Sequence, residues 1–123
     1  MTQEVEQAGY EDLQNYISDN WDYIELVDDE GDAVTRIGVA DERLNITIED
    51  TEDDGDNDTV RWTVEVQGSD EDIPLGTTLE ASRLFKEETG GDVFHTDTHE
   101  SAPIASEDDT VQVQHDIEVP EIV

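Results

Sequence analysis

Three segments of this chain alternate apolar and polar residues with a period of two, which is the pattern of a strand with one buried face. They are residues 44–49, 60–66 and 111–119. His115 interrupts the apolar face of the third segment, where a hydrogen-bonded core or interface histidine is expected. Because successive strand side chains point to opposite faces, the three segments predict a β-rich protein with a shared core. The residues expected to supply most of that core are Leu44, Ile46, Ile48, Trp62, Val64, Val66, Val111, Val113 and Ile117.

The N-terminal segment, residues 5–20, has a different period. Tyr10, Leu13 and Ile17 recur at the spacing of one helix face, and Trp21 follows on the same side. We therefore expect a clear helix over this segment.

Clusters of Gly, Asp and Pro divide the remainder into short elements. The predicted strands are residues 21–27, 33–39, 44–49, 59–67, 93–98 and 110–119. Residues 78–88 fit a helix and a strand equally, and periodicity leaves both open. Short strands at this spacing favour a mainly β fold, a small antiparallel β-sandwich or barrel with one N-terminal α-helix. We expect a single domain over residues 1–123, with the sandwich over residues 21–119.

The charge of the chain is extreme: 36 acidic residues against five basic ones give a net charge of −31. Such an excess usually indicates disorder, but here the acids alternate with apolar residues and fall on the outer faces of the strands. They repel one another in dilute buffer, whereas molar salt shortens the Debye length to about 3 Å. The composition predicts a folded protein adapted to molar salt. It argues against nucleic-acid binding, and mimicry of DNA phosphates is the weaker alternative.

Composition and motifs also exclude several kinds of chemistry. The chain has no cysteine, which excludes disulfides, thiolate zinc sites and a cysteine nucleophile. Its serines lie in no nucleophile-elbow sequence, and the chain carries no glycine-rich phosphate loop. No segment approaches the ~20 apolar residues of a membrane-spanning helix. We therefore expect neither an enzyme nor a membrane protein, and no resident cofactor.

Two segments carry side chains of the kind that bind metals. Residues 50–58 begin like an EF-hand loop, but its twelfth position is Arg61 instead of a bidentate carboxylate. We favour a solvated acidic turn there, with weak Ca²⁺ or Mg²⁺ binding as the alternative. His95, Asp97 and His99 would share one face of a strand at intervals of about 7 Å, too far apart to hold one ion together.

The C-terminal half carries a series of short motifs. They are IPLGTT at residues 73–78, ASRLF at 81–85, TGGD at 89–92 and DDTVQV at 108–113. The series resembles small β-sandwich structural proteins of tailed viruses, in which an LF and TGG segment precedes a final DDT-type strand. The resemblance covers residues 73–119, and residues 16–26 resemble the openings of such proteins less distinctly.

The resemblance implies a non-enzymatic virion protein of a halophilic, haloarchaeal tailed virus. It would be a capsid decoration or turret component, with a tail, neck or baseplate position as the alternative. Its partners would be other virion proteins and further copies of itself, and it would occupy a host cytoplasm at molar salt before assembly. A cellular β-sandwich binding domain is the competing class.

Large apolar side chains that a small sandwich leaves uncovered are candidates for contacts between subunits, and serving as core is their alternative role. Basic side chains are also candidates, because the chain has so few of them that each could pair with an acidic residue of a neighbouring subunit. Pairing with an acidic residue of the same chain is the alternative. The predicted interface residues are Tyr10, Tyr16, Arg83, Leu84, Phe85, Lys86 and Phe94.

Overall fold

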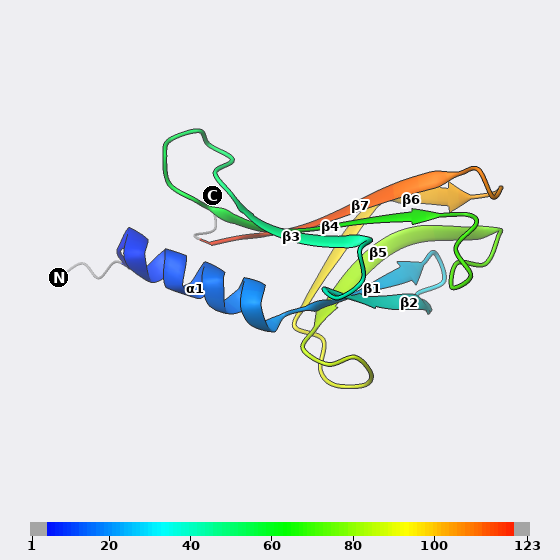
Figure 1. Cartoon of the computed structure of the whole chain (residues 1–123), viewed down its shortest axis with the longest axis horizontal. Coiled ribbons are helices and arrows are strands. Elements are labelled where there is room, and N and C mark those ends of the chain that lie inside the picture. Colours follow the sequence, from blue (N-terminus) through cyan, green and yellow to red (C-terminus); the bar gives the residue numbers. More distant parts are fainter. Residues whose placement is uncertain (1–4, 120–123) are drawn as a thin grey trace.

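The three alternating segments pair with one another in a single sheet (Figure 1). The computed structural model describes residues 5–119, which form the helix α1 and two antiparallel sheets packed as a sandwich. The elements are α1 (Gln7–Asn20), β1 (Tyr23–Asp28), β2 (Ala33–Gly38), β3 (Leu44–Glu49), β4 (Thr59–Gln67), β5 (Thr77–Phe85), β6 (His95–Ile104) and β7 (Thr110–Glu118). Sheet A has the order β2-β1-β5-β6, and sheet B has the order β3-β4-β7. The expected mainly β fold is confirmed.

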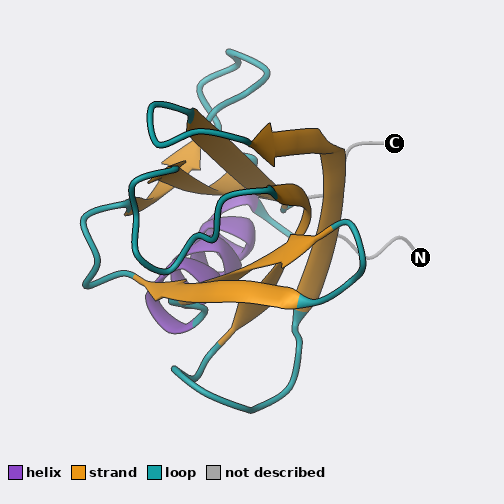
Figure 2. Cartoon of the chain, turned by 90° about the vertical axis from the view of Figure 1, so that its right-hand side faces the viewer, coloured by secondary structure: helices purple, strands orange, loops and turns teal. Residues whose placement is uncertain are grey.

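The core lies between the sheets and draws on both of them. Figure 2 shows the strands of the two sheets and the helix beside them. Trp62 is fully buried, and its indole N–H donates a hydrogen bond to the carbonyl of Trp21 at 2.8 Å. Of the core residues expected from alternation, the buried ones are Leu44, Trp62, Val64, Val66 and Val113, and the half-buried ones are Ile46, Ile48, Val111 and Ile117. Sheet A adds buried residues that alternation did not single out, namely Ile24, Leu26, Ile37, Leu79, Leu84 and Ile104.

The segment that fitted both helix and strand is a strand. β5 lies between β1 and β6 and pairs with both, so its backbone groups are bonded on each side. Its core face carries Leu79, Ser82 and Leu84, with an irregularity in the pairing between Leu79 and Ala81. Pairing with neighbours that are distant in sequence decides the conformation, and local propensity does not.

The helix α1 is confirmed, and its one fully buried residue among those described is polar. Gln14 is 1% exposed, whereas Leu13 is 48% exposed and Tyr10 and Ile17 are half-buried. The side-chain amide of Gln14 donates to the carbonyls of Asn57 and Val119, at 2.7 and 2.5 Å. These bonds attach α1 to one end of the sandwich, where Figure 1 shows it, and Ile17 adds an apolar contact with the core.

Candidate functional site

The outer surface of sheet A carries an ion-pair group centred on Glu25. In register, Glu25 of β1 lies opposite Arg36 of β2 on one side and Arg83 of β5 on the other. Arg36 donates to one carboxylate oxygen through Nε at 3.2 Å and Nη2 at 2.9 Å, while Nη1 of Arg83 lies 3.6 Å from the other oxygen. Glu25 is only 8% exposed, so these two arginines supply its main charge compensation.

Arg36 also holds the segment that follows β5. Its Nη1 donates to the carbonyls of Glu87 and Gly90, at 3.0 and 2.8 Å, and its guanidinium lies 3.4 Å from the centre of the Phe85 ring. Gly90 and Gly91 have positive φ angles of 65° and 79°, a conformation that favours glycine. The TGG motif is therefore a turn fixed against sheet A by one arginine.

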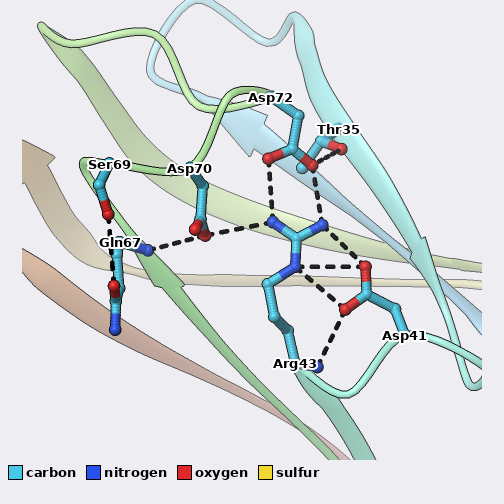
Figure 3. A network of polar contacts seen from close by, with 7 residues as sticks. All are labelled: Thr35, Asp41, Arg43, Gln67, Ser69, Asp70 and Asp72. Atoms are coloured by element: carbon cyan, nitrogen blue, oxygen red, sulfur yellow. Dashed lines mark hydrogen bonds and ion pairs between the residues drawn. The ribbon is translucent and has the colours of Figure 1, made fainter.

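A second network surrounds Arg43 (Figure 3). Its guanidinium binds Asp41 at 2.8 Å, Asp70 at 3.2 Å and Asp72 at 2.9 Å, and the Thr35 hydroxyl donates to Asp72. Hydrogen bonds from Arg43 lower the pKa of Asp41 and of Asp72 below the usual aspartate value. The network joins β2, the β2–β3 connection and the β4–β5 loop at one end of the sandwich.

An open cavity of about 400 Å³ adjoins this network. Its lining includes Asp41, Glu42, Glu65 and Asp70, together with Arg43. The guanidinium already bonds to two of these four carboxylates and stands where a bound cation would be expected. Arg43 therefore offsets part of the negative charge that lines the cavity and joins this lining to the scaffold.

Pairing with an acid of the same chain, the alternative for the basic residues, is what the structure shows for the four arginines. Besides the contacts of Arg36, Arg43 and Arg83, Arg61 of β4 binds Asp116 of β7 across the strand pair at 2.9 Å. Lys86 differs, because its partner is the Tyr16 hydroxyl, to which its ammonium donates at 3.0 Å.

Ser82, His115 and His95 form a hydrogen-bonded chain that crosses between the sheets. Ser82 Oγ lies 2.6 Å from His115 Nδ1, and His115 Nε2 lies 2.8 Å from His95 Nδ1. Ser82 and His115 are fully buried, and burial lowers the pKa of His115 to about 3, assisted by the charge of His95. The expected hydrogen-bonded core histidine is confirmed. A nucleophilic role for Ser82 is disfavoured, because its hydroxyl has no exposed surface at which a substrate could react.

The three metal-type residues of β6 share one half-buried face, as expected. His95 bonds to His115, and His99 Nδ1 lies 2.8 Å from the carbonyl of Glu100. Across residues 5–119, no three His, Asp or Glu side chains are grouped so that they could hold a metal ion.

The acidic loop between β3 and β4 uses several carboxylates to order its own backbone. Asp50 accepts hydrogen bonds from the N–H groups of Asp54 and Gly55, and Asp58 accepts from the N–H groups of Thr51 and Glu52. These bonds support a structured acidic turn. Weak Ca²⁺ or Mg²⁺ binding at this loop stays a prediction.

Exposed apolar side chains gather where α1 meets the segment after β5. Tyr16 is 51% exposed and Phe94 is 41% exposed. The Lys86 ammonium lies 5.3 Å from the centre of the Tyr16 ring and 5.1 Å from that of Phe94. Leu13, one turn before Tyr16 on α1, is also exposed. We call Leu13, Tyr16, Lys86 and Phe94 the assembly face.

Three of the predicted interface residues, Tyr16, Lys86 and Phe94, are thus brought together from two segments about 70 residues apart in the chain. Tyr10 is half-buried on the inner side of α1. No local signal in the sequence identifies Leu13 as exposed, because the burial of its neighbour Gln14 depends on the distant carbonyls of Asn57 and Val119.

The prediction is corrected for Leu84 and Phe85, which are 0% and 4% exposed. Leu84 points into the core from a central strand, and the Arg36 guanidinium covers Phe85. Arg83 lies on the outer face of sheet A and pairs with Glu25. Leu84 and Phe85 are therefore part of the buried structure of the sandwich, whereas Arg83 is a partly exposed residue with a carboxylate partner in its own chain.

A scan against protein-family models, a search of curated proteins and a search of solved structures found no match to this chain. Among residues 5–119, no helix has the length and apolar character needed to cross a membrane. The assembly face and the acidic surface around it are the features of the structure that bear on function.

Proposed function

We propose that this chain is a non-enzymatic structural protein of a halophilic tailed virus, a capsid decoration or turret component. A tail, neck or baseplate position is the alternative placement within the particle. The observation that carries the proposal is the assembly face: two aromatic rings and a leucine are exposed on a protein of net charge −31. Exposed apolar groups gathered on a polar surface mark sites of contact with other proteins.

The distribution of charge supports a role in a crowded assembly at molar salt. All four arginines pair with carboxylates of the same chain, so the outer surface is left dominated by acids. Neighbouring copies would repel one another at low ionic strength, and molar salt screens that repulsion within a few ångströms. Many small contacts repeated by symmetry then supply avidity that a single contact lacks.

A passive role is also supported by the buried polar chemistry. Ser82, which contacts His115, is fully buried between the sheets, and burial keeps His115 neutral. The sequence motifs that resemble tailed-virus structural proteins lie on β5, β7 and the turns around them. Two of these motifs adjoin the assembly face in sequence: ASRLF at 81–85 directly precedes Lys86, and TGGD at 89–92 lies between Lys86 and Phe94.

The proposal is tested by mass spectrometry of particles purified at molar salt from cells that carry the gene. We expect the protein in many copies per particle, and we expect Phe94→Ala to lower its incorporation. Leu75→Ala is the matched control, because Leu75 is an apolar side chain that is 53% exposed, against 41% for Phe94, but lies in the β4–β5 loop. Absence from particles, with a free monomer recovered from the cytoplasm, would instead support the cellular binding domain.

A further inference from the structure

We propose that His95 is an acid-sensitive switch between the two sheets: its protonation fixes the direction of the hydrogen bond that it shares with His115. In the protonated state His95 donates and His115 accepts, whereas a neutral His95 allows the bond to run either way. We call Ser82, His115 and His95 the histidine chain. The switch lies within the fold and does not depend on the proposed function.

His95 and His115 connect two strands that are not paired with each other. β6 is an outer strand of sheet A and β7 is an outer strand of sheet B, so each pairs with a single neighbour in its own sheet. The bond between His95 Nδ1 and His115 Nε2, 2.8 Å long, therefore links the two sheets on this side of the sandwich. A change in this bond changes how β6 is held against the opposite sheet.

The two rings differ in their access to solvent, so an added proton goes to His95. His115 is fully buried, and burial lowers its pKa to about 3. His95 is half-buried at the edge of sheet A. Its second nitrogen, Nε2, has no hydrogen-bond partner among residues 5–119 and is accessible to solvent. Proton uptake at His95 thus leaves the buried ring neutral.

A protonated His95 permits only one arrangement of hydrogens in the histidine chain. Because both of its nitrogens then carry hydrogens, His95 donates from Nδ1 and His115 Nε2 is the acceptor. The single hydrogen of the neutral His115 ring must then lie on Nδ1, from which it donates to Ser82 Oγ at 2.6 Å. In total one proton is added, to His95, and the hydrogen of His115 is confined to Nδ1.

A neutral His95 also permits the reverse arrangement. Ser82 then donates to His115 Nδ1, and His115 Nε2–H donates to His95. Protonation removes this second arrangement and places a positive charge on the donor. Hydrogen bonds from a charged donor are stronger than those between neutral groups, so we expect β6 to be tied more firmly to β7 in the protonated state.

The titratable side chains around the histidine chain come from two strands. They are Asp97 and His99, which share the half-buried face of β6 with His95, and Asp116, which follows His115 on β7. The core side chains that β4 and β5 place beside the chain are uncharged, namely Trp62, Ser82 and Leu84. The two aspartates favour a positive charge on His95, and a protonated His99 opposes it. None of the three bonds to the ring nitrogens that join His95 to His115.

NMR spectroscopy of the nitrogen-15-labelled wild-type protein at molar KCl tests the switch, because a hydrogen shared by two nitrogens couples both of them. The coupling across the bond identifies the pair, and the larger one-bond coupling identifies the nitrogen that carries the hydrogen. At about pH 5 we expect this hydrogen on His95 Nδ1, and at about pH 8 we expect part of the population to carry it on His115 Nε2. The ring signals of His95 and His115 should change together, since one protonation causes both changes.

Three outcomes would overturn the proposal. They are a hydrogen that stays on the same nitrogen throughout this pH range, ring signals that change at different pH values, and a missing coupling between the two rings at both ends of the range. The first two would show that the rings titrate without the proposed linkage, and the third would show that the bond does not form in solution.

Two matched variants show whether His95 is the group that causes the change. His95→Gln removes the titrating ring, so the nitrogen signals of His115 should no longer change over this pH range. His99→Gln removes a histidine from the same face of β6 but keeps His95, and it should retain the change. A His115 signal that still changes in His95→Gln would assign control to another group. Whether the protein occurs in particles affects none of these results.

Discussion

Ser82 Oγ lies 2.6 Å from Nδ1 of His115, and this hydrogen bond joins β5 of sheet A to β7 of sheet B inside the core. His115 uses its other ring nitrogen to bond His95, so its two nitrogens have opposite roles. If the serine hydroxyl donates to Nδ1, then Nε2–H donates to His95, and the reverse assignment is equally complete. Either way the hydrogen bonds are satisfied by a neutral His115 ring.

A neutral buried histidine makes stability depend on pH. Burial lowers the pKa of His115 to about 3, whereas the unfolded chain has the ordinary histidine value of 6.5. As pH falls below 6.5, His115 becomes protonated in the unfolded state but stays neutral in the folded state, so the free energy of unfolding falls. Between pH 6.5 and 5 the expected loss is about 2 kcal/mol.

Urea unfolding of the protein at fixed molar KCl between pH 7 and 5 checks this expectation, because most carboxylates titrate below that range. His115→Gln should be less stable overall but should lose most of this pH dependence. His99→Gln is the control and should keep it. A free energy of unfolding that is constant from pH 7 to 5 would show that His115 does not resist protonation.

Trp62 should be the most costly core residue of sheet B to truncate. It is fully buried between the sheets, so Trp62→Ala removes a large side chain and its hydrogen bond to Trp21. We expect a loss of about 3 to 5 kcal/mol in the free energy of unfolding, measured by chemical denaturation. In native protein, acrylamide should quench Trp62 only weakly, as read in a Trp21→Phe background. Ready quenching would mean that the β4 register is wrong.

Arg36 and Arg83 flank the same carboxylate but should differ in importance. Arg36→Ala removes two hydrogen bonds to Glu25 and two to the backbone of the 86–94 segment. Arg83→Ala removes one longer ion pair and one long hydrogen bond to the carbonyl of Gly31. We expect a cost of about 2 to 3 kcal/mol for Arg36→Ala and less than about 1 kcal/mol for Arg83→Ala. Limited proteolysis should cut residues 86–94 faster in Arg36→Ala only. Equal effects of the two substitutions would show that the contacts of Arg36 with Glu25 and with the 86–94 segment do not hold that segment in place.

Salt should stabilise the fold itself. Lowering KCl from molar concentration to about 0.1 M lengthens the Debye length to near 10 Å, which restores repulsion among the surface acids. We expect the melting temperature to fall steadily through the series, and sucrose at matched osmolality should not replace the salt. A melting temperature that is unchanged or higher at low salt would contradict the prediction that this protein is adapted to molar salt.

The sequence by itself determined the strands in which one face is buried and the other is wet. The bounds of β3 and β4 agree with those predicted, and β7 ends one residue earlier than predicted. The agreement arises because alternation of apolar and polar residues indicates which side chains are buried on folding. The helix was also predictable, although it begins at Gln7 instead of residue 5. The acidic residues of these strands alternate with the apolar ones, so their position on the outer faces of the strands could be predicted from the sequence.

Only the tertiary structure decided features that depend on partners distant in sequence. Residues 77–85 became a strand because β1 and β6 pair with them on both sides. Gln14 became buried because the carbonyls of Asn57 and Val119 accept its amide, and no local pattern encodes those acceptors. The same holds for Ser82 and His115, which share a hydrogen bond across 33 residues of chain. Periodicity reports how a side chain alternates with its neighbours, whereas these contacts depend on how two sheets are stacked.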